Sequence, residues 1–207
     1  MPGRLVIIFV KAPRAGFVKT RLAQTVGSET ALETYRTLVE VITTSLAEVD
    51  AVDLHYAPSD AQKEISPWLA AGWSCSPQCD GDLGAKLNNA FAQAFEKGRE
   101  RVIIIGSDCP YLATADIDEA DEALKSADVV LGPATDGGYW LVGLSKPAPE
   151  IFENINWSTE TVLDETQAKA KSAHLTVQLL RELSDVDDVT DLMRFHEWSL
   201  GRGIPAN

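Results

Sequence analysis

The sequence is poor in cysteine, in histidine and in long hydrophobic runs, and each shortage excludes a class of protein. Its 207 residues include three cysteines and three histidines, too few and too scattered for a disulfide framework or a zinc site. We expect reduced thiols, with Cys75 and Cys79 as small core or loop residues, and structural histidines. No apolar run approaches the roughly 20 residues that span a bilayer. The sequence therefore predicts a protein without a membrane span.

Basic residues are also scarce, and their distribution is uneven. The chain has 18 lysines and arginines against 31 acidic residues, and the net charge of −13 argues against nucleic acid as a partner. Residues 1–28 contain five basic residues and no acidic one. A purely basic segment in an acidic protein indicates a local site for an anion, with a chance cluster of surface charges as the alternative.

Length and composition predict one globular domain. A chain of 207 residues with 45% hydrophobic and 24% charged residues can bury one substantial core. Repeats, low-complexity tracts and linkers are not found, so we expect a single domain over residues 1–207. The apolar run at residues 5–10 is followed at once by Lys11 and is too short for a signal peptide. We therefore expect a cytoplasmic protein, and the oligomeric state stays open, a homo-oligomer included.

The sequence RVIIIGSDCPYL at residues 101–112 is the central feature of the chain. Its apolar run 102–105 is typical of a strand that is buried on both faces within a parallel sheet. Gly106 and Pro110 end that strand. Asp108 then lies just past the carboxyl end of a central strand, where open α/β sheets bind their ligands. Its carboxylate is either the N-cap of the next helix or a metal ligand, and this stretch alone favours neither.

Apolar periodicity along the rest of the chain predicts alternating strands and helices, and hence an α/β fold. Strands are expected at residues 5–10, 52–57, 129–131, 139–142 and 175–180. Helices are expected from residue 19, at 31–49, 60–71, 83–95, 117–124 and 161–170, and from residue 187. At the start of this last helix, Asp185, Asp187 and Asp188 are most simply interpreted as caps that complement the helix dipole.

The loop after the first strand, KAPRAGFVKTRLA at residues 11–23, is basic. A P-loop requires glycine immediately before its lysine, and Val18 stands before Lys19, so a P-loop is excluded. Gly16 would let the backbone approach an anion, close to the start of a helix. The positive charges that would hold a phosphate there come from Lys11, Lys19 and Arg21.

The sequence GPATDGGYWLVGL at residues 132–144 contains a tight turn, Asp136-Gly137-Gly138, of the type found in hairpins. Two interpretations are open. The turn either connects two strands and has no further role, or it displays a second acidic residue at the same edge of the sheet as Asp108.

Six motifs, in the order in which they occur, together resemble a known family. They are VKAPRAGFVKTRL, QCDGDLGAKL, IIIGSDCPYL, PATDGGYWLVGL, NINWST and DVDDVTDL, and the match covers residues 5–195. The combination is similar to small bacterial glycosyltransferase-like proteins described as nucleotide-diphospho-sugar transferases. More distantly, it resembles the nucleotidyltransferases that make guanylylated cofactors. The resemblance implies the three-layer, Rossmann-like GT-A fold, in which a mostly parallel sheet binds a nucleotide diphosphate over its carboxyl edge.

The resemblance also implies roles for individual residues. Asp108 would hold a divalent metal, Mg²⁺ or Mn²⁺, and would act in catalysis with Lys19 and Asp136. Nucleotide and phosphate would be bound by Lys11, Gly16, Lys19, Arg21, Asp82 and Lys86. The acceptor side would be formed by Gly137, Gly138, Tyr139, Trp157 and Ser158. Two departures stand out: a single Asp108 replaces the usual acidic pair, and Lys86 stands where arginine, with its bidentate contact to an anion, is expected.

The function implied is the metal-dependent transfer of a sugar from a nucleotide diphospho-sugar to a small-molecule acceptor. The first alternative is a nucleotidyltransferase, in which a substrate phosphate attacks an NTP and pyrophosphate leaves. The second alternative is a non-catalytic nucleotide-binding regulator. Its expected signature is the loss of Asp108 or Lys19, and both residues are present. The sequence leaves the nucleobase, the sugar and the acceptor open.

Overall fold

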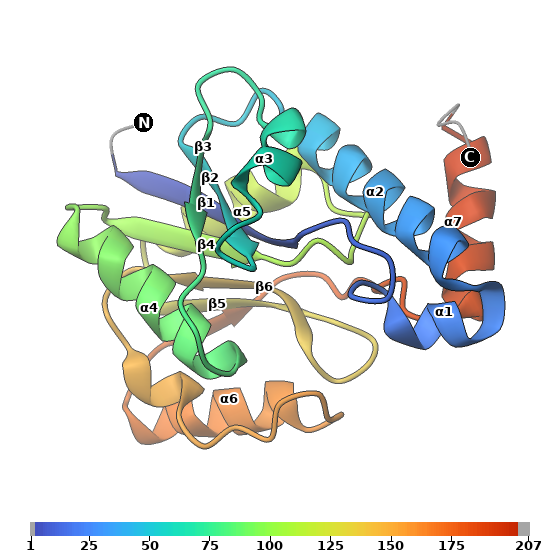
Figure 1. Cartoon of the computed structure of the whole chain (residues 1–207). Helices are drawn as coiled ribbons and strands as arrows, with labels where there is room; N and C mark the ends of the chain where they lie inside the picture. The colour runs from blue at the N-terminus through green and yellow to red at the C-terminus, as the bar shows by residue number, and fades with distance from the viewer. Residues whose placement is uncertain (1–2, 203–207) are drawn as a thin grey trace.

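A single sheet organises the fold (Figure 1). The computed structural model describes residues 3–202, in which seven strands form this sheet. The strands are β1 (Arg4–Lys11), β2 (Val52–Ala57), β3 (Ser74–Pro77), β4 (Arg101–Ile105), β5 (Val129–Pro133), β6 (Tyr139–Leu144) and β7 (Val177–Leu179). Their order is β3-β2-β1-β4-β6-β5-β7. β6 runs antiparallel to β4 and β5, and the other neighbouring strands are parallel. The predicted mostly parallel sheet is confirmed.

Helices cover both faces of the sheet and complete three layers (Figure 1). They are α1 (Thr20–Val26), α2 (Ser28–Ser45), α3 (Gln62–Ile65), α4 (Leu83–Glu96), α5 (Thr114–Ala123), α6 (Val162–Ser172) and α7 (Val189–Leu200), with 3-10 turns η1 (Ser66–Trp68) and η2 (Pro149–Phe152). α2, α3 and α5 pack on one face, and α4 and α6 pack on the other. α7 packs against α1 and α2 at the side. No described helix is both long and apolar enough to cross a membrane.

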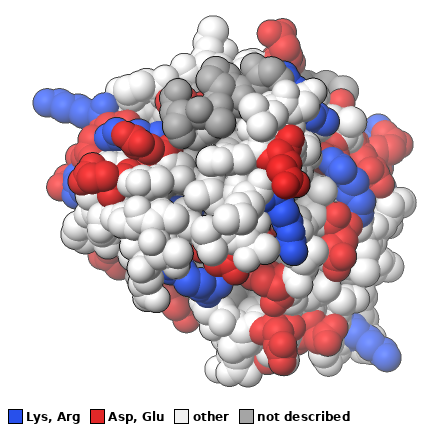
Figure 2. Space-filling view, turned by 90° about the vertical axis from the view of Figure 1, so that its right-hand side faces the viewer, with Lys and Arg blue, Asp and Glu red and all other residues white. Residues whose placement is uncertain are grey.

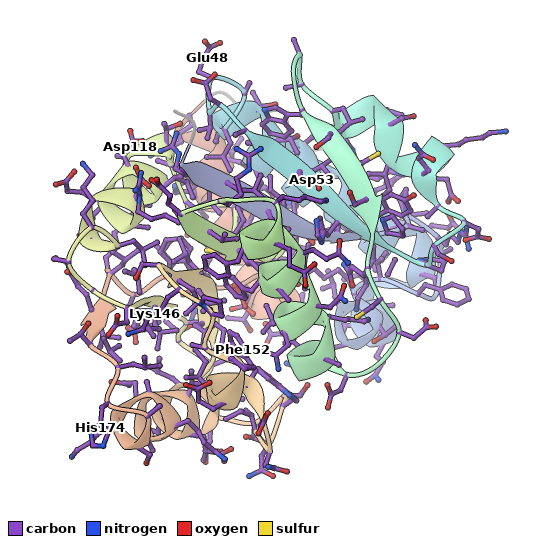
Figure 3. All side chains as sticks on the ribbon, turned by 90° about the vertical axis from the view of Figure 1, so that its left-hand side faces the viewer. Glu48, Asp53, Asp118, Lys146, Phe152 and His174 are labelled. Carbon is purple, nitrogen blue, oxygen red and sulfur yellow. The ribbon has the colours of Figure 1, made fainter. Side chains whose placement is uncertain are left out.

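The two faces of β1 explain why its sequence is continuously apolar. Val6 and Ile8 pack toward α2, whereas Ile7 packs toward α4, and all three side chains are fully buried. Each such burial stabilises the fold by about 1.5–3 kcal/mol. On the α4 face, Phe91 of α4 stacks on Phe152 with ring centroids 5.6 Å apart. Figure 3 shows Phe152 beside α4, between that helix and α6.

Several predicted elements differ in the structure. The edge strand β3 was not predicted, because its sequence SCSP has no apolar run to mark it. The predicted helix over residues 60–71 is wrong in extent. It is divided into α3 and η1, and Pro67 removes a backbone donor that a continuous α-helix would need. The last strand is limited to the three residues of β7, with Gln178 and Leu179 exposed.

Candidate functional site

A cavity of about 640 Å³ opens where the carboxyl ends of β1 and β4 meet the turn between β5 and β6. This edge is where open α/β sheets bind ligands. The cavity brings together many of the residues predicted from the sequence, namely Lys11, Lys19, Arg21, Lys86, Asp108, Asp136, Gly138, Tyr139, Trp157 and Ser158. Gly16, Asp82 and Gly137 are not among the described residues that line it.

Asp108 lies in the turn after β4, at the wall of the cavity. The next helix, α5, begins only at Thr114, and its first turn is capped by Asp116, which accepts a 2.7 Å hydrogen bond from the backbone just before the helix. The interpretation of Asp108 as a helix cap is therefore wrong. Its backbone carbonyl accepts a hydrogen bond from the amide of Val186 at 2.9 Å. Its carboxylate forms an ion pair with the ammonium of Lys19.

Lys19 joins two carboxylates of the cavity. Its Nζ contacts Asp108 and lies 3.3 Å from Oδ1 of Asp187, and its side chain is only 4% exposed. The backbone of Lys19 has a φ of 46°, a left-handed conformation that is uncommon for residues other than glycine. Burial on its own lowers the pKa of Lys19, but the charges of the two carboxylates outweigh burial, and the pKa is raised. Lys19 is therefore a buried, charged ammonium.

A hydrogen-bonded tyrosine fixes the spacing between the ends of β1 and β4. The hydroxyl of Tyr35, from α2, accepts a hydrogen bond from the backbone amide of Lys11 at 2.7 Å and lies 3.3 Å from Oγ of Ser107. Burial raises the pKa of Tyr35 well above its usual range, so the hydroxyl stays neutral. Sequence periodicity placed Tyr35 only in the helix core. Its hydroxyl holds in place the two strand ends that carry Lys11 and Asp108.

The interpretation of Asp185 and Asp187 as caps of α7 is wrong. Asp188 alone is the N-cap residue, and its carboxylate accepts hydrogen bonds from the amides of Thr190 at 2.8 Å and Asp191 at 3.0 Å. Both Asp185 and Asp187 line the cavity instead. They are functional candidates that the sequence analysis missed.

The segment between β7 and α7 explains where these two carboxylates lie. The segment is fastened at one end by Arg181, whose guanidinium binds Asp116 through two hydrogen bonds of 2.6 and 2.7 Å. Val186 is fully buried against α1 and α2. Asp185 and Asp187, on either side of Val186, line the cavity. The alternation Asp-Val-Asp at residues 185–187 was therefore the signal that could have placed both carboxylates at the cavity.

Asp185 has a strongly perturbed acidity. Its pKa is raised from an ordinary 3.8 to about 7, first by burial and then by the negative charges of Asp108 and Asp136, while Lys19 acts in the opposite direction. The carboxylates around Asp185 thus carry more negative charge than Lys19 neutralises. Such perturbation, in a cleft and with specific charged neighbours, is typical of functional carboxylates.

The turn Asp136-Gly137-Gly138 is a hairpin turn, as predicted, and it also reaches the cavity. Oδ1 of Asp136 accepts a hydrogen bond from the amide of Gly138 at 2.9 Å, which orders the turn between β5 and β6. The backbone carbonyl of Gly137 accepts a hydrogen bond from the amide of Leu163 at 2.9 Å. Gly137 therefore faces α6 rather than the cavity. Only Asp136 and Gly138 of this turn line the cavity.

Gly137 offers a direct test of that structural role. Its φ is 87°, and a Cβ at this position would collide with the backbone of Glu160. Gly16 has a similar φ of 80° but open space around it. Left-handed strain costs both Gly→Ala variants about 1–2 kcal/mol, and we expect Gly137→Ala to lose at least a further 1 kcal/mol because of the collision. Urea unfolding of the two variants measures this difference, and equal losses would contradict the assignment.

The aromatic residues predicted for the acceptor side form one wall of the cavity. Tyr139 and Trp157 meet edge to face, with ring centroids 6.5 Å apart and an angle of 80° between the rings. Trp157 also lies against α4 at Gly84, where an added Cβ would come within 3.1 Å of the indole nitrogen. Asp82 is the N-cap of α4, as expected for an aspartate directly before the helix: its carboxylate accepts a hydrogen bond from the amide of Ala85 at 2.8 Å. It is not among the described residues that line the cavity, where a nucleotide-binding role would place it.

The basic segment of residues 1–28 does not form a free positive surface. Arg4 pairs with Asp118 at 2.9 Å, Arg14 with Glu64 at 2.6 Å, and Arg21 with Asp187 at 3.3 Å. Figure 2 shows the side of the molecule on which α1 and α7 lie in Figure 1, with basic and acidic side chains interspersed across it. Within residues 3–202, Lys11 and Lys86 are cavity lysines without a carboxylate partner.

The carboxylates at the cavity have the right chemistry for a hard divalent cation. Four of them line it, namely Asp108, Asp136, Asp185 and Asp187, and carboxylate oxygen is the preferred ligand of Mg²⁺ and Mn²⁺. Among the described residues, no three acidic, histidine or cysteine side chains enclose a metal position by themselves. Mg²⁺ commonly takes one or two carboxylates and completes its shell with water and substrate phosphates. The residues fit a metal site that is shared with substrate.

Comparison with known proteins assigns the fold and the family. A crystal structure from Desulfovibrio desulfuricans G20, described as that of a "putative nucleotide-diphospho-sugar transferase", is 34% identical to this chain. The match covers 96% of this chain and 88% of that one, with a TM-score of 0.89. The fold is thus that of the nucleotide-diphospho-sugar transferases. Residues 39–159 match a bacterial family described as "Uncharacterized protein conserved in bacteria (DUF2064)", and the chain belongs to it.

More distant structures share the fold alone. The inositol-1-phosphate CTP transferase of T. maritima is 14% identical, with 100% of this chain and 99% of that chain covered and a TM-score of 0.58. Rv0371c of Mycobacterium tuberculosis H37Rv, solved in complex with manganese, is 15% identical, with 94% and 98% covered and a TM-score of 0.56. A search of curated proteins found no match. The named relatives and neighbours with a stated activity are transferases.

Proposed function

We propose that the protein is a metal-dependent glycosyltransferase, which moves a sugar from a nucleotide diphospho-sugar to a small acceptor. The observation that carries this proposal is the pairing of unpartnered lysines with a group of carboxylates in one cavity at the carboxyl edge of the sheet. The volume of about 640 Å³ lies within the range of small-molecule sites. Lys11 and Lys86 are free to meet a diphosphate, and the carboxylates are suited to its counter-cation.

The reaction requires that charge on the leaving group be stabilised. As the bond between the sugar and the diphosphate breaks, the diphosphate gains negative charge. The ammonium groups of Lys11 and Lys86 would neutralise that charge without having to be reorganised in the transition state, and Lys19 would add its charge once it has left Asp108. Mg²⁺ or Mn²⁺, held by Asp108 and Asp185, would supply Lewis-acid stabilisation of the same phosphate oxygens. Asp136 would bind the acceptor hydroxyl or take its proton, because it lies at the cavity on the turn beside the aromatic wall.

A nucleotidyltransferase is the second candidate, and one observation favours it: a fold neighbour is a named CTP transferase. The same lysines and carboxylates would then serve an NTP, and the phosphate of a second substrate would attack its α-phosphorus with loss of pyrophosphate. Glycosyl transfer is the first choice because the 34% identical relative is described as a "putative nucleotide-diphospho-sugar transferase".

One incubation separates these functions. The protein is mixed with a panel of nucleotide sugars and NTPs, with Mg²⁺ or Mn²⁺ and a set of small sugar and phosphate acceptors, and the products are resolved by mass spectrometry. Release of a nucleoside diphosphate with a glycosylated product supports the proposal. Release of pyrophosphate would establish the nucleotidyltransferase instead. Tight nucleotide binding with no product from any combination would favour the non-catalytic regulator.

A further inference from the structure

We propose that Lys19 is an internal counter-ion, which holds the cation position of the ligand-free cavity and must leave Asp108 before a divalent metal can bind there. The inference rests on the proposed function, because that function supplies the metal. It assigns Lys19 two successive partners: the carboxylates when the cavity is empty, and the substrate phosphate when it is filled.

The contacts of Lys19 support the first of these states. Its ammonium contacts Asp108 and lies 3.3 Å from Oδ1 of Asp187, and the side chain is only 4% exposed. Arg21 takes the other carboxylate oxygen of Asp187, also at 3.3 Å. A phosphate cannot reach an ammonium that is buried between two carboxylates. In this structure the ammonium of Lys19 is therefore paired with carboxylates of the protein and is not accessible to an anion.

Geometry and charge make the ammonium and the metal competitors. Lys19 contacts one of the two carboxylate oxygens of Asp108, so a metal on either oxygen of this carboxylate would lie close to the ammonium. Two cations held side by side on one carboxylate repel each other. The cavity therefore admits metal at Asp108 only in molecules from which Lys19 has moved.

The backbone at Lys19 is placed to allow that movement. Lys19 is the junction between the loop after β1 and the first turn of α1, and its φ of 46° is a left-handed conformation. Strain of this kind, held in place by side-chain contacts, is released when the contacts are lost. Gly16 and Phe17 of the loop before the junction are exposed, whereas Val18 is buried in the core, so the movement is confined to Lys19 itself.

Metal and nucleotide binding are coupled as a consequence. Metal alone must displace the ammonium from Asp108 and leave it with Asp187 as its remaining carboxylate partner. The apparent affinity of the protein for metal is therefore reduced, because only the molecules in which Lys19 has left Asp108 can bind it. A nucleotide diphosphate offers Lys19 a new partner and brings oxygen ligands for the metal. By linkage, each ligand then tightens the binding of the other by the same factor.

The test measures Mn²⁺ binding without nucleotide, by titration followed with electron paramagnetic resonance. We expect Lys19→Met to bind Mn²⁺ at least about tenfold more tightly than the parent. Lys86→Met is the matched control, because it removes the same charge from a half-buried lysine of the same cavity that has no carboxylate contact. Lys19→Arg, which keeps a cation at the carboxylates, is expected to stay as weak as the parent. An unchanged affinity in Lys19→Met, or an equal gain in Lys86→Met, would overturn the inference.

A second measurement uses the unaltered protein and does not depend on the folding of a variant. Acetylation rates of individual lysines are read by mass spectrometry, with and without Mn²⁺. Lys19 should react more slowly than Lys11 in the metal-free protein and should become several-fold more reactive at saturating Mn²⁺. Continued protection of Lys19 at saturating metal overturns the inference. Neither measurement involves product formation, so a failed transfer assay with a displaced Lys19 would refute the proposed function alone.

Discussion

Asp108→Asn is expected to lower turnover by about 10²–10³-fold while the protein keeps its fold, the range found when one preorganised charge-stabilising group is removed. The substitution keeps the shape of the side chain and removes its charge. Asp108 does not cap α5, and its structural hydrogen bond to Val186 is made by the backbone carbonyl, which the variant retains. The substitution therefore weakens the binding of metal and removes the charged partner of Lys19, and it leaves the fold intact.

Melting curves separate this outcome from a general loss of stability. A ligand at a hundred times its dissociation constant stabilises the parent by about 2.7 kcal/mol, which raises the Tm of a protein of this size by roughly 5–10 °C. With Mn²⁺ and the nucleoside diphosphate identified in the product assay, the parent should show this shift and Asp108→Asn should show little of it. Asp118→Asn is the control, because Asp118 is exposed and its one ion pair among residues 3–202 is with Arg4. A full ligand-dependent shift in Asp108→Asn would place the metal on other carboxylates.

Asp185→Asn is expected to stabilise the metal-free protein at pH 8 by up to about 4 kcal/mol, the free energy that corresponds to its shifted pKa. The pKa of Asp185 is about 7 in the folded protein, against an ordinary 3.8. Between about pH 4 and pH 7 the folded state holds a proton that the unfolded chain has released. Stability therefore falls as the pH rises through this window, and it stays lower above pH 7. Asparagine carries no charge, so the variant does not lose the stability that ionisation of Asp185 removes from the parent.

Urea unfolding of variant and parent at pH 4 and pH 8 measures the effect. The advantage of Asp185→Asn should be large at pH 8 and close to zero at pH 4. Asp128→Asn serves as a control of opposite sign, because Lys146 and the amide of Thr176 lower the pKa of Asp128, so that its charge stabilises the fold at neutral pH. An Asp185→Asn variant no more stable than the parent at pH 8 would contradict the charge assignment. A variant that is more stable and less active would mark Asp185 as functional.

Short-range patterns in the sequence predicted most of the fold. The apolar runs of β1, β2 and β4 were long enough to identify as buried strands, and each lies within one or two residues of its predicted range. The break after β4 placed Asp108 at the carboxyl edge of the sheet, and the glycine turn at residues 136–138 predicted the hairpin of β5 and β6. These features could be predicted because burial on both faces of a strand and the backbone freedom of a tight turn depend on residues next to one another in the chain.

The combination of charges in the cavity was decided by tertiary structure alone. The sequence presented a basic segment and an acidic remainder, whereas the fold pairs Lys19 with Asp187, 168 residues away. Whether a carboxylate caps a helix or faces a cavity depends on where the chain runs next, as the different positions of Asp187 and Asp188 show. Coulomb attraction acts across space and leaves no periodic pattern in the chain. The fold follows from local sequence here, but the balance of charge at the cavity exists only once the strands and the segment before α7 have come together.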